Sequence, residues 1–326
     1  MYCISQSEEK YTTRKNYRLM FYNVENLFDY YHDSSLVYND FTPLGKLNWT
    51  KNKYIRKRNN LYKVIRAAGG WDGIAILGLA EIENEFVITD LLNSTPLSKL
   101  GYRFIHFDSK DHRGIDVALV YDPDCFELIS SHAVHITDPL SPEFKTRDML
   151  YAKGVIGGEI VHIIVVHWTS RYRGLMKSAP LRMFSSNVLK FFCDSICSID
   201  KSSSIIVMGD FNDNPENESM TNLAYLSSCG LSNLPHLPVN GYVEGTLKYH
   251  ENWYCFDQIL VSDNMLKPEN KINCDSVLRI FDADFLLERD SKYLGYKLFR
   301  TNIGFKYHGG ISDHLPVFVD IEISNK

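Results

Sequence analysis

Short polar motifs that end apolar segments lie along nearly the whole chain, and this dispersal most constrains how the chain can fold. Nearly every motif follows a hydrophobic run that is typical of a buried strand. The motifs are Asn23-Val24-Glu25, Glu81, His167-Trp168, Gly209-Asp210-Phe211-Asn212, Phe256-Asp257 and Ser312-Asp313-His314. Six strand ends with carboxylate, amide and imidazole groups can converge on one site. We therefore expect a single domain over residues 18–326, preceded by a polar tail over residues 1–17.

The composition restricts the class of protein. The chain has 326 residues, of which 44% are hydrophobic and 23% charged, as in an ordinary globular protein with a large core. The formal net charge of −5 argues against a strongly basic nucleic-acid binder, because phosphate neutralisation dominates such affinity. It does not exclude a nuclease, since a few arginines and a metal ion can hold one phosphate.

No apolar stretch approaches the length of a transmembrane helix, so we expect no membrane span. Residues 1–18 lack the apolar segment of a signal peptide, although a trimmed sequence would look the same. Seven cysteines are present, and none forms a CxxC pair, which argues against a zinc site. Their odd count and apolar surroundings predict buried free thiols, which favour a reducing compartment. We expect a cytoplasmic monomer.

Hydrophobic periodicity predicts more strands than helices. Strands are expected at residues 18–23, 73–80, 102–107, 115–121, 126–129, 133–136, 149–156, 159–167, 205–208, 253–261 and 315–323. Helices are expected at residues 54–68, around residues 86–91 and from Ser178 onward, with Pro180 in the first turn. The inward face of the last helix is expected to include Leu181, Phe184, Val188, Phe191 and Phe192. This mixture predicts a layered α/β architecture.

Asp210 and Asn212 follow the apolar strand at residues 205–208. In an extended segment these two side chains point to the same side. The carboxylate could take a proton from an attacking water, while the amide binds the phosphate or the carboxylate. The alternative is that both residues, with Asp213 and the residues after it, only form a turn.

Asn23 and Glu25 repeat this geometry, and Glu81 follows the strand at residues 74–80. Ionised carboxylates at strand ends suit Mg²⁺, which prefers hard oxygen ligands. Glu83 and Glu85 share the parity of Glu81, so spacing alone does not choose among the three. Glu83 or Glu85 could instead belong to the first turn of the next helix, where negative charge is favourable.

Two histidines have a context that points to chemistry. Asp257 opens a strand, where a buried carboxylate needs a partner. His314 is a candidate partner, because an Asp that orients a His recurs in acid–base sites. His167 ends the strand at residues 159–167. Most of the other histidines are assigned no role.

These residues together resemble the endonuclease/exonuclease/phosphatase superfamily. It includes deoxyribonuclease I, abasic-site endonucleases, neutral sphingomyelinases and inositol polyphosphate 5-phosphatases. The match runs from Asn23 to about Ile323 and rests on the motifs that contain Asp210 and His314. The segment around Asn23, Tyr-Asn-Val-Glu-Asn-Leu-Phe-Asp, is similar to bacterial members that are mostly uncharacterised.

The resemblance implies a four-layer α/β sandwich, in which two mixed β-sheets pack face to face with helices on the outer faces. It also implies Mg²⁺ or Mn²⁺ near Glu81, with Asn23, Glu25 and Asp313 close by.

The resemblance further assigns catalytic roles. It implies Asp210 and Asn212 at the attacking water and the phosphate, and His314, oriented by Asp257, against the scissile phosphate. His167 matches the second catalytic histidine of the deoxyribonuclease and sphingomyelinase branches, which counts against the abasic-site branch.

Four arginines are candidates for phosphate binding, because a guanidinium group can bind two oxygens at once. They are Arg113, Arg147, Arg171 and Arg173. Arg147 resembles a phosphate-contacting arginine of deoxyribonuclease I. Any one of the four could be a solvated surface residue, and we expect at least two to face the cleft.

The loop at residues 29–49 is rich in aromatic residues. It carries Tyr30, Tyr31, Tyr38, Phe41 and Trp49. The loop could overhang the cleft and favour a small phosphoester, or its aromatic side chains could pack it against the body of the protein.

We expect a divalent-metal-dependent phosphoester hydrolase that acts by in-line water attack. Its substrate is a phosphodiester, with nucleic acid as one option. The alternative is a phosphatase or phosphodiesterase that acts on lipid, sugar or inositol phosphates. A non-catalytic binding module is a third hypothesis, against which the presence of Asp210, Asp313 and His314 argues.

Overall fold

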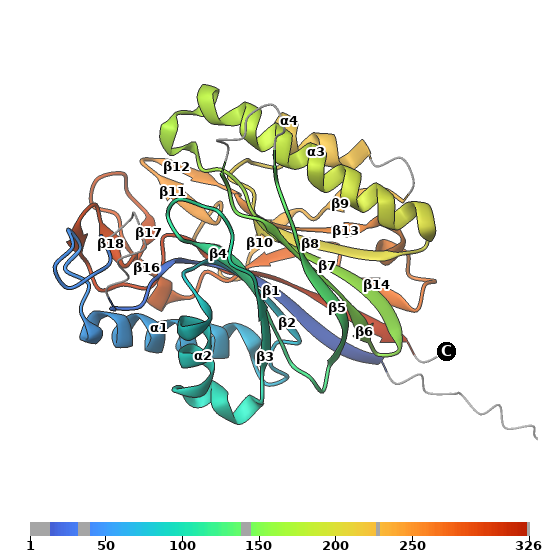
Figure 1. Ribbon diagram of the computed structural model, residues 1–326, viewed down its shortest axis with the longest axis horizontal. Coiled ribbons are helices and arrows are strands. Elements are labelled where there is room, and N and C mark those ends of the chain that lie inside the picture. The colour runs from blue at the N-terminus through green and yellow to red at the C-terminus, as the bar shows by residue number, and fades with distance from the viewer. Residues whose placement is uncertain (1–13, 32–39, 138–144, 226–228, 325–326) are drawn as a thin grey trace, which may run out of the picture.

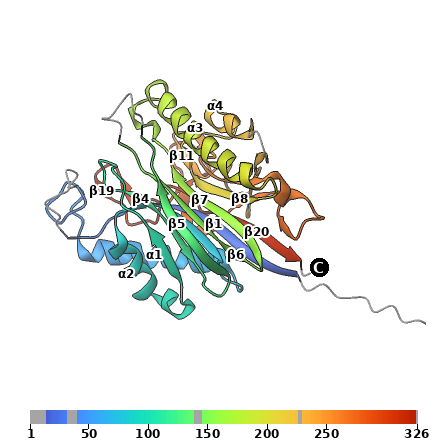
Figure 2. The same ribbon diagram turned by 45° about the vertical axis from the view of Figure 1, so that its right-hand side comes forward.

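The computed structural model describes residues 14–31, 40–137, 145–225 and 229–324. Two mixed β-sheets pack face to face, and helices cover the outer face of each sheet (Figure 1). The four-layer α/β sandwich predicted from the sequence is confirmed. The turned view separates the helices below one sheet from the helices above the other (Figure 2).

The first sheet has eight strands, and its central strand β1 pairs in parallel with β2 and antiparallel with β20. Across this sheet the strands are β10 (His236–Pro238), β15 (Leu278–Ile280), β20 (Val317–Ser324), β1 (Arg14–Leu27), β2 (Ile76–Ile82), β4 (Asp116–Tyr121) and β3 (Arg103–His106), with β14 (Ile272–Cys274) also beside β20.

The second sheet has six strands, and its only parallel pair in the described part of the chain is β7 with β8. Its order is β5 (Phe126–Val134), β6 (Met149–Ile156), β7 (Glu159–His167), β8 (Ser204–Asp210), β13 (Asp257–Ser262) and β9 (Leu231–Asn233). Two-stranded ribbons are formed by β11 (Leu247–Tyr249) with β12 (Asn252–Tyr254), β16 (Leu287–Arg289) with β17 (Tyr296–Leu298), and β18 (Asn302–Ile303) with β19 (Lys306–Tyr307).

The α-helices are α1 (Lys51–Gly69), α2 (Glu85–Asn93), α3 (Leu175–Ile199) and α4 (Glu218–Thr221). Short 3₁₀ helices are η1 (Pro96–Leu100), η2 (Arg171–Arg173), η3 (Asn222–Tyr225), η4 (Asp263–Leu266) and η5 (Asp284–Leu286). Gly70 follows α1 with a φ of 61°, which glycine adopts without a steric cost. Among the described residues, no helix is both long and apolar enough to span a bilayer.

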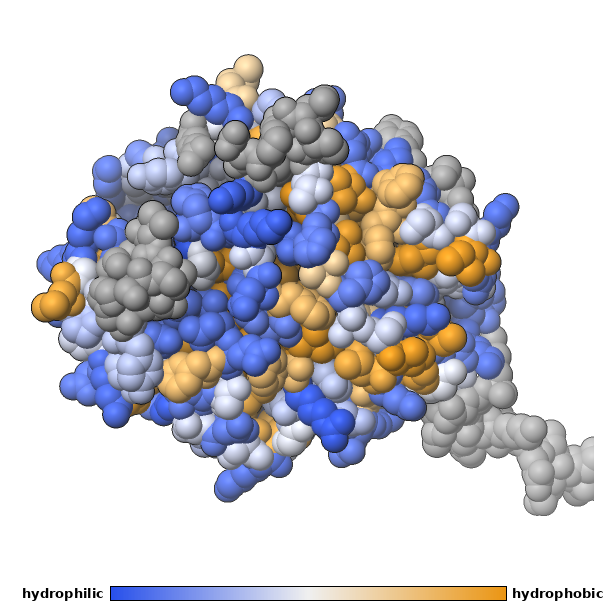
Figure 3. All heavy atoms as spheres, viewed as in Figure 1, coloured by the Kyte–Doolittle hydropathy of each residue, from blue (hydrophilic) through white to orange (hydrophobic). Residues whose placement is uncertain are grey.

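The two sheets meet through fully buried apolar side chains, among them Phe21 of β1 and Met208 of β8. Gly78 of β2 leaves room for Met208 of the facing sheet, because a Cβ atom at residue 78 would lie 2.7 Å from the sulfur of Met208. On the face shown in Figure 3, apolar side chains gather towards the end that holds the C-terminus. The opposite end, where β1, β2, β7 and β8 terminate, is largely hydrophilic on this face.

The predicted inward face of the third helix is correct only in part. Phe184, Val188 and Phe192 are partly buried and pack against the core beneath α3, as predicted. Phe191 is 78% exposed, whereas Arg182, Ser185 and Ser186 are fully buried. These polar side chains tolerate burial because each has a partner. Arg182 Nε lies 2.7 Å from a carboxylate oxygen of Asp213, and both serine hydroxyls donate to backbone carbonyls.

Two of the cysteines predicted to be free form a disulfide. Cys197, in the last turn of α3, is bonded to Cys229, and their Cα atoms are 5.9 Å apart. α3 packs against η3, which ends at Tyr225, and this contact brings Cys197 and Cys229 into the same region. Cys193 and Cys274 are buried free thiols, as expected.

Two strand predictions also need correction. The segments predicted at residues 126–129 and 133–136 are joined in one strand, β5, which ends at Val134. The segment at residues 253–261 divides into β12 and β13, because the backbone amide of Cys255 turns to the side chain of Asn214. This break makes Asp257 the first residue of β13.

The aromatic residues of the loop at residues 29–49 pack mainly against the body of the protein. Trp49 is fully buried and donates its indole hydrogen to the carbonyl of Phe28 at 2.9 Å. Phe41 is also buried, and its ring stacks on Phe28 with 4.4 Å between centroids. Tyr31 is exposed, and Tyr38 lies outside the described residues. For Phe41 and Trp49 the prediction that they overhang the cleft is therefore wrong.

Substitution of Trp49 tests this packing role. We expect Trp49→Ala to lower the free energy of unfolding by about 3–5 kcal/mol, because it removes a fully buried aromatic side chain. Chemical denaturation followed by circular dichroism measures the change. Trp71 is fully exposed and serves as the matched control, so Trp71→Ala should stay within about 0.5 kcal/mol of the parent. Equal stability of both variants would contradict this role for Trp49.

Candidate active site

Strand register places three of the predicted residues side by side. His167 ends β7, Asp210 ends β8 and Asp257 begins β13. The pairing aligns His167 with Asp210 and Asp210 with Asp257. Since residues directly opposite each other on neighbouring strands share a face, these side chains lie together.

Backbone irregularities mark the same end of the molecule. The register shifts after Asn23 in β1 and after Ala80 in β2, as it does at β-bulges. Glu25, Glu81 and Asn212 have φ values of 52°, 64° and 52°, in a region that non-glycine residues rarely adopt. Such conformations cost energy and cluster at functional sites.

His314 and Asp257 form a buried pair. Nδ1 of His314 lies 2.7 Å from Oδ2 of Asp257, and both residues are buried. Burial alone would lower the pKa of His314, but the carboxylates of Asp257 and Asp210 raise that pKa well above its usual value. The imidazole is therefore held in its charged form.

Asp210 lies at the centre of the group. Its Oδ2 accepts a hydrogen bond from the amide of Asn23 at 2.9 Å, and its Oδ1 accepts one from the backbone of Asn212 at 2.9 Å. Oδ2 is also 3.8 Å from Nε2 of His314 and 3.5 Å from Nε2 of His167. Burial raises the pKa of Asp210, and Asp257 adds to this rise while His314 opposes it.

His167 is held through the backbone that follows it. Arg147 is buried, and its guanidinium donates to the carbonyls of His167 and Trp168 and to a carboxylate oxygen of Asp111. Burial and the positive charge of Arg147 lower the pKa of His167 well below its usual value. His167 is therefore neutral beside Asp210.

Arg171 holds the backbone at Asn212 in a similar way. Its guanidinium donates to the carbonyl of Asn212 at 2.8 Å and to Asp213 at 2.6 Å. It also lies over the ring of Phe256, 4.6 Å from the centroid. Arg147 and Arg171 therefore bond to the protein itself, and direct phosphate contact by either stays a prediction. The side chain of Arg173 lies outside the described residues.

Glu81 lies at the candidate site, whereas Glu83 and Glu85 do not share its contacts. Its Oε2 accepts the backbone amide of Asn26 at 2.8 Å, and its Oε1 lies 3.6 Å from the guanidinium of Arg113. Glu83 instead accepts the backbone amide of Asp29, and Glu85 is exposed in the first turn of α2.

Glu25 is the centre of a buried charge pair that the sequence did not reveal. Its two oxygens accept the backbone amides of Thr301 and Asn302 at 2.6 and 3.3 Å. Lys57 of α1 is fully buried 4.0 Å away and donates to the carbonyls of Glu25 and Ile311. Burial raises the pKa of Glu25 and lowers the pKa of Lys57, while each charge opposes the shift of the other.

Asp313 also has a cation that sequence reasoning missed. Arg300 donates to Asp313 at 2.7 Å and lies 3.6 Å from Glu25. Burial alone would raise the pKa of Asp313, but Arg300 holds it below its usual value. Arg300 has 41% of its side chain exposed, so it can move without breaking the core. No spacing in the sequence distinguishes Lys57 or Arg300 from surface residues of the same type.

The acidic residues at this end fit a divalent cation. Glu81 and Asp313 offer hard carboxylate oxygens, and their charge is balanced by the partly exposed Arg113 and Arg300. Both oxygens of Glu25 already accept backbone amides, and Asn23 is bonded to Asp210. Glu81 and Asp313 are thus candidate ligands of a divalent cation.

Three other residues of the candidate site are also close enough together to hold a metal ion. Ligand atoms of Asp210, Asp257 and His314 lie within 4.8 Å of one another. The contact of 2.7 Å between His314 and Asp257 is a hydrogen bond, however, and it is typical of an acid–base pair.

The chain is similar to known proteins in sequence pattern and in fold. Residues 18–323 match the sequence pattern of the Endonuclease/Exonuclease/phosphatase family. No curated protein sequence matches the chain significantly.

Solved structures of this family share the fold. A family protein from Bacteroides thetaiotaomicron has a TM-score of 0.61 and 15% identity, over 96% of this chain and 100% of the other. A mannosyl-6-phosphatase from the same organism has a TM-score of 0.58 and 15% identity, over 94% and 99%. D. rerio TDP2 with a single-strand DNA product has a TM-score of 0.55 and 14% identity, over 94% and 98%.

Removal of the Asp257 charge tests the electrostatics of the buried pair. Asp257→Asn keeps the shape of the side chain, and we expect it to lower the pKa of His314, because the raised value depends on this carboxylate. NMR titration of the His314 imidazole in the metal-free protein measures the change. Asp148→Asn, beside the exposed His135, is the matched control and should leave the titration of His314 unchanged. An unchanged pKa of His314 in Asp257→Asn would show that Asp210 alone maintains its charge.

Proposed function

The chain belongs to the endonuclease/exonuclease/phosphatase family, and from this premise we propose that it is a divalent-metal-dependent phosphoester hydrolase. One observation carries the proposal. The buried carboxylate of Asp210 lies within 4 Å of two histidines, one charged and one neutral. A base beside a fixed positive charge is what in-line attack of water on phosphorus requires.

Asp210 is proposed to orient the attacking water and to take its proton. Hydrogen bonds from Asn23 and from the backbone of Asn212 fix this carboxylate, so it need not reorganise during the reaction. A pKa raised by burial makes the carboxylate a stronger base than an exposed aspartate. The side-chain amide of Asn212 donates to the carbonyl of Trp168, which keeps Asn212 beside Asp210.

His314 is proposed to donate hydrogen bonds to the phosphate oxygens as negative charge develops on them. Its Nδ1 is engaged by Asp257, which leaves Nε2 directed towards Asp210 and the substrate. Preorganised donors of this kind contribute much of the rate of phosphoryl transfer. His167, whose Nδ1 makes no hydrogen bond among the described residues, is proposed to assist the leaving oxygen.

Glu81 and Asp313 are proposed to hold Mg²⁺ or Mn²⁺, with Asn23 and Glu25 shaping the surroundings. When bound, the ion would act as a Lewis acid on a phosphoryl oxygen. Arg113 and Arg300, which balance these carboxylates, are proposed to turn towards the substrate phosphate. Because a guanidinium group is always charged, this exchange of partners needs no proton transfer.

For the substrate we propose a phosphodiester, with nucleic acid as one option. Two observations support an alternative class of substrate. The alternative is a phosphomonoester or phosphodiester of a lipid, sugar or inositol. The net charge of −5 weakens attraction for a long duplex. In addition, Arg147 and Arg171 bond to the protein itself, so they add no positive track for a nucleic-acid backbone.

Asp210→Asn tests the proposed base. Turnover is measured with Mg²⁺ on plasmid DNA, a bis(p-nitrophenyl) ester and a phosphomonoester, and the substrate that is cleaved identifies the class. We expect the rate on that substrate to fall at least ~10²-fold, the lower range for a positioned proton transfer, while KM changes far less. Asp124→Asn, on an exposed residue, is the matched control. An unchanged turnover number for Asp210→Asn would refute the assignment.

Glu81→Gln tests the metal site. It keeps the side-chain shape but removes the charge, so we expect the Mg²⁺ concentration needed for half-maximal activity to rise sharply. Circular dichroism should be unchanged. Glu83→Gln and Glu85→Gln are matched controls, because these residues face away from the site. If Glu83→Gln, and not Glu81→Gln, raises the Mg²⁺ concentration needed for half-maximal activity, then Glu83 is the ligand.

A further inference from the structure

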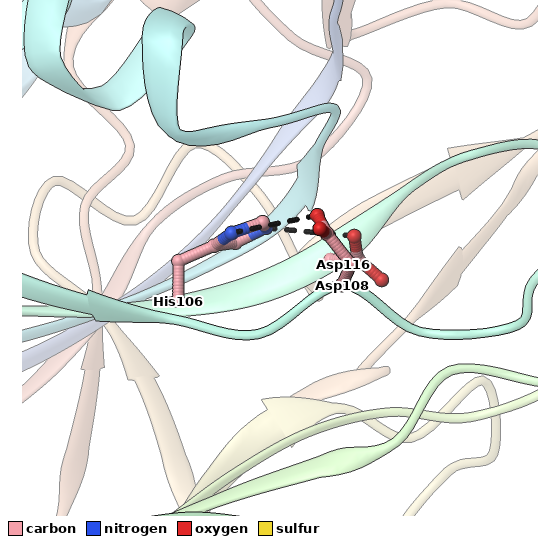
Figure 4. A group of neighbouring side chains, drawn as sticks. All are labelled: His106, Asp108 and Asp116. Carbon is pink, nitrogen blue, oxygen red and sulfur yellow. Dashed lines mark ion pairs between the residues drawn. The ribbon is translucent and has the colours of Figure 1, made fainter.

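A second group of metal-ligating side chains lies outside the candidate active site. His106 ends β3, Asp116 begins β4, and Asp108 follows β3 in the connecting loop. One ligand atom from each residue lies within 4.8 Å of the others. Figure 4 shows the imidazole ring and the two carboxylates turned towards one another.

The imidazole of His106 is buried, and its Nε2 has no hydrogen bond among the described residues, while Nδ1 lies 3.9 Å from Oδ1 of Asp108. Its side chain is 1% exposed. A buried polar atom without a partner carries an energetic cost that a native site normally avoids. The nearest acidic atom is Oδ2 of Asp116, at 3.4 Å.

This distance of 3.4 Å matches two ligands of one metal ion. Zinc binds histidine nitrogen at about 2.0–2.1 Å and carboxylate oxygen at about 2.0–2.2 Å. For tetrahedral coordination these bond lengths separate neighbouring ligand atoms by roughly 3.3–3.5 Å. The spacing of His106 and Asp116 therefore suits an ion between them better than a direct hydrogen bond, which is shorter.

We propose that His106, Asp108 and Asp116 form a second divalent-metal site, which takes an ion of the Zn²⁺ class. Asp108 is 89% exposed, so its carboxylate can close onto the ion from the solvent side, and water completes the coordination. An imidazole ligand favours zinc-like transition metals over Mg²⁺, which takes oxygen ligands. The absence of a CxxC pair does not bear on this site, because none of its ligands is a cysteine.

The ion would fasten the base of the loop between β3 and β4. Asp116 uses its other oxygen to accept the backbone amide of Ser109 at 3.0 Å. Further along the loop, Asp111 binds Arg147, and Arg113 lies beside Glu81. The proposed site therefore anchors the segment that positions two cationic groups of the candidate active site. This role is separate from the chemistry proposed for Asp210 and His314.

Zinc binding to the full chain tests the proposal. Isothermal titration calorimetry and metal analysis after dialysis measure the affinity and the stoichiometry. We expect one Zn²⁺ at this site, in addition to any ion held by Glu81 and Asp313, that binds in the micromolar range or tighter and persists in Glu81→Gln and Asp257→Asn. We expect Asp108→Asn and Asp116→Asn each to weaken Zn²⁺ binding at least about tenfold, which is the lower end of the loss seen when a group that supports a metal site is removed.

Asp108→Asn is the decisive variant, because its exposed side chain can change without disturbing the fold. His106→Asn should abolish binding of the same ion. His135→Asn is the matched control, since His135 makes an ordinary contact of 2.8 Å with Asp148. Two results would overturn the proposal: no Zn²⁺ bound at concentrations up to about 1 mM, or an affinity that Asp108→Asn and Asp116→Asn leave unchanged.

Discussion

The hydrogen bond from Asn23 to Asp210 is the contact on which the arrangement of this end of the molecule depends. Asn23 belongs to β1 of the first sheet and Asp210 to β8 of the second, and their side chains are 2.9 Å apart and buried. An amide that donates to a carboxylate tolerates little displacement, so the packing of the two sheets and the position of the proposed base are linked. The core that holds the sheets together thus also holds the site.

Buried charge is the second constraint. Glu25 with Lys57, and Arg147 with Asp111, are ion pairs whose side chains are at least nine-tenths buried. Buried pairs of this kind often contribute no net stability compared with apolar residues, because desolvation offsets their attraction. Their concentration at the ends of the strands therefore points to function rather than to stability. Lys57 in particular brings α1 into contact with the segments near residues 301 and 311, which flank the site.

The layered fold and the central residues could be predicted because both depend on local patterns. Apolar runs such as residues 205–208 predict strands, and polar residues directly after them predict a shared edge. The buried polar residues of α3 could not be predicted, because Arg182 is buried through Asp213, which lies beyond the next strand. Lys57 and Arg300 were missed for the same reason, since their partners come from distant segments. The choice of Glu81 over Glu83 depended on a β-bulge that spacing does not reveal.

The arginines show how position rather than residue type decides a role. Arg147 and Arg171 are of the residue type expected of phosphate ligands. Their guanidinium groups nevertheless donate to the backbone carbonyls of His167, Trp168 and Asn212. In doing so they fix two strand ends whose backbone would otherwise be free to move. Arg113 and Arg300 instead lie beside Glu81 and Asp313, the proposed metal ligands, with 26% and 41% of their side chains exposed. The position of these two cations supports the proposal that the site holds a single phosphate group rather than following a long anionic chain.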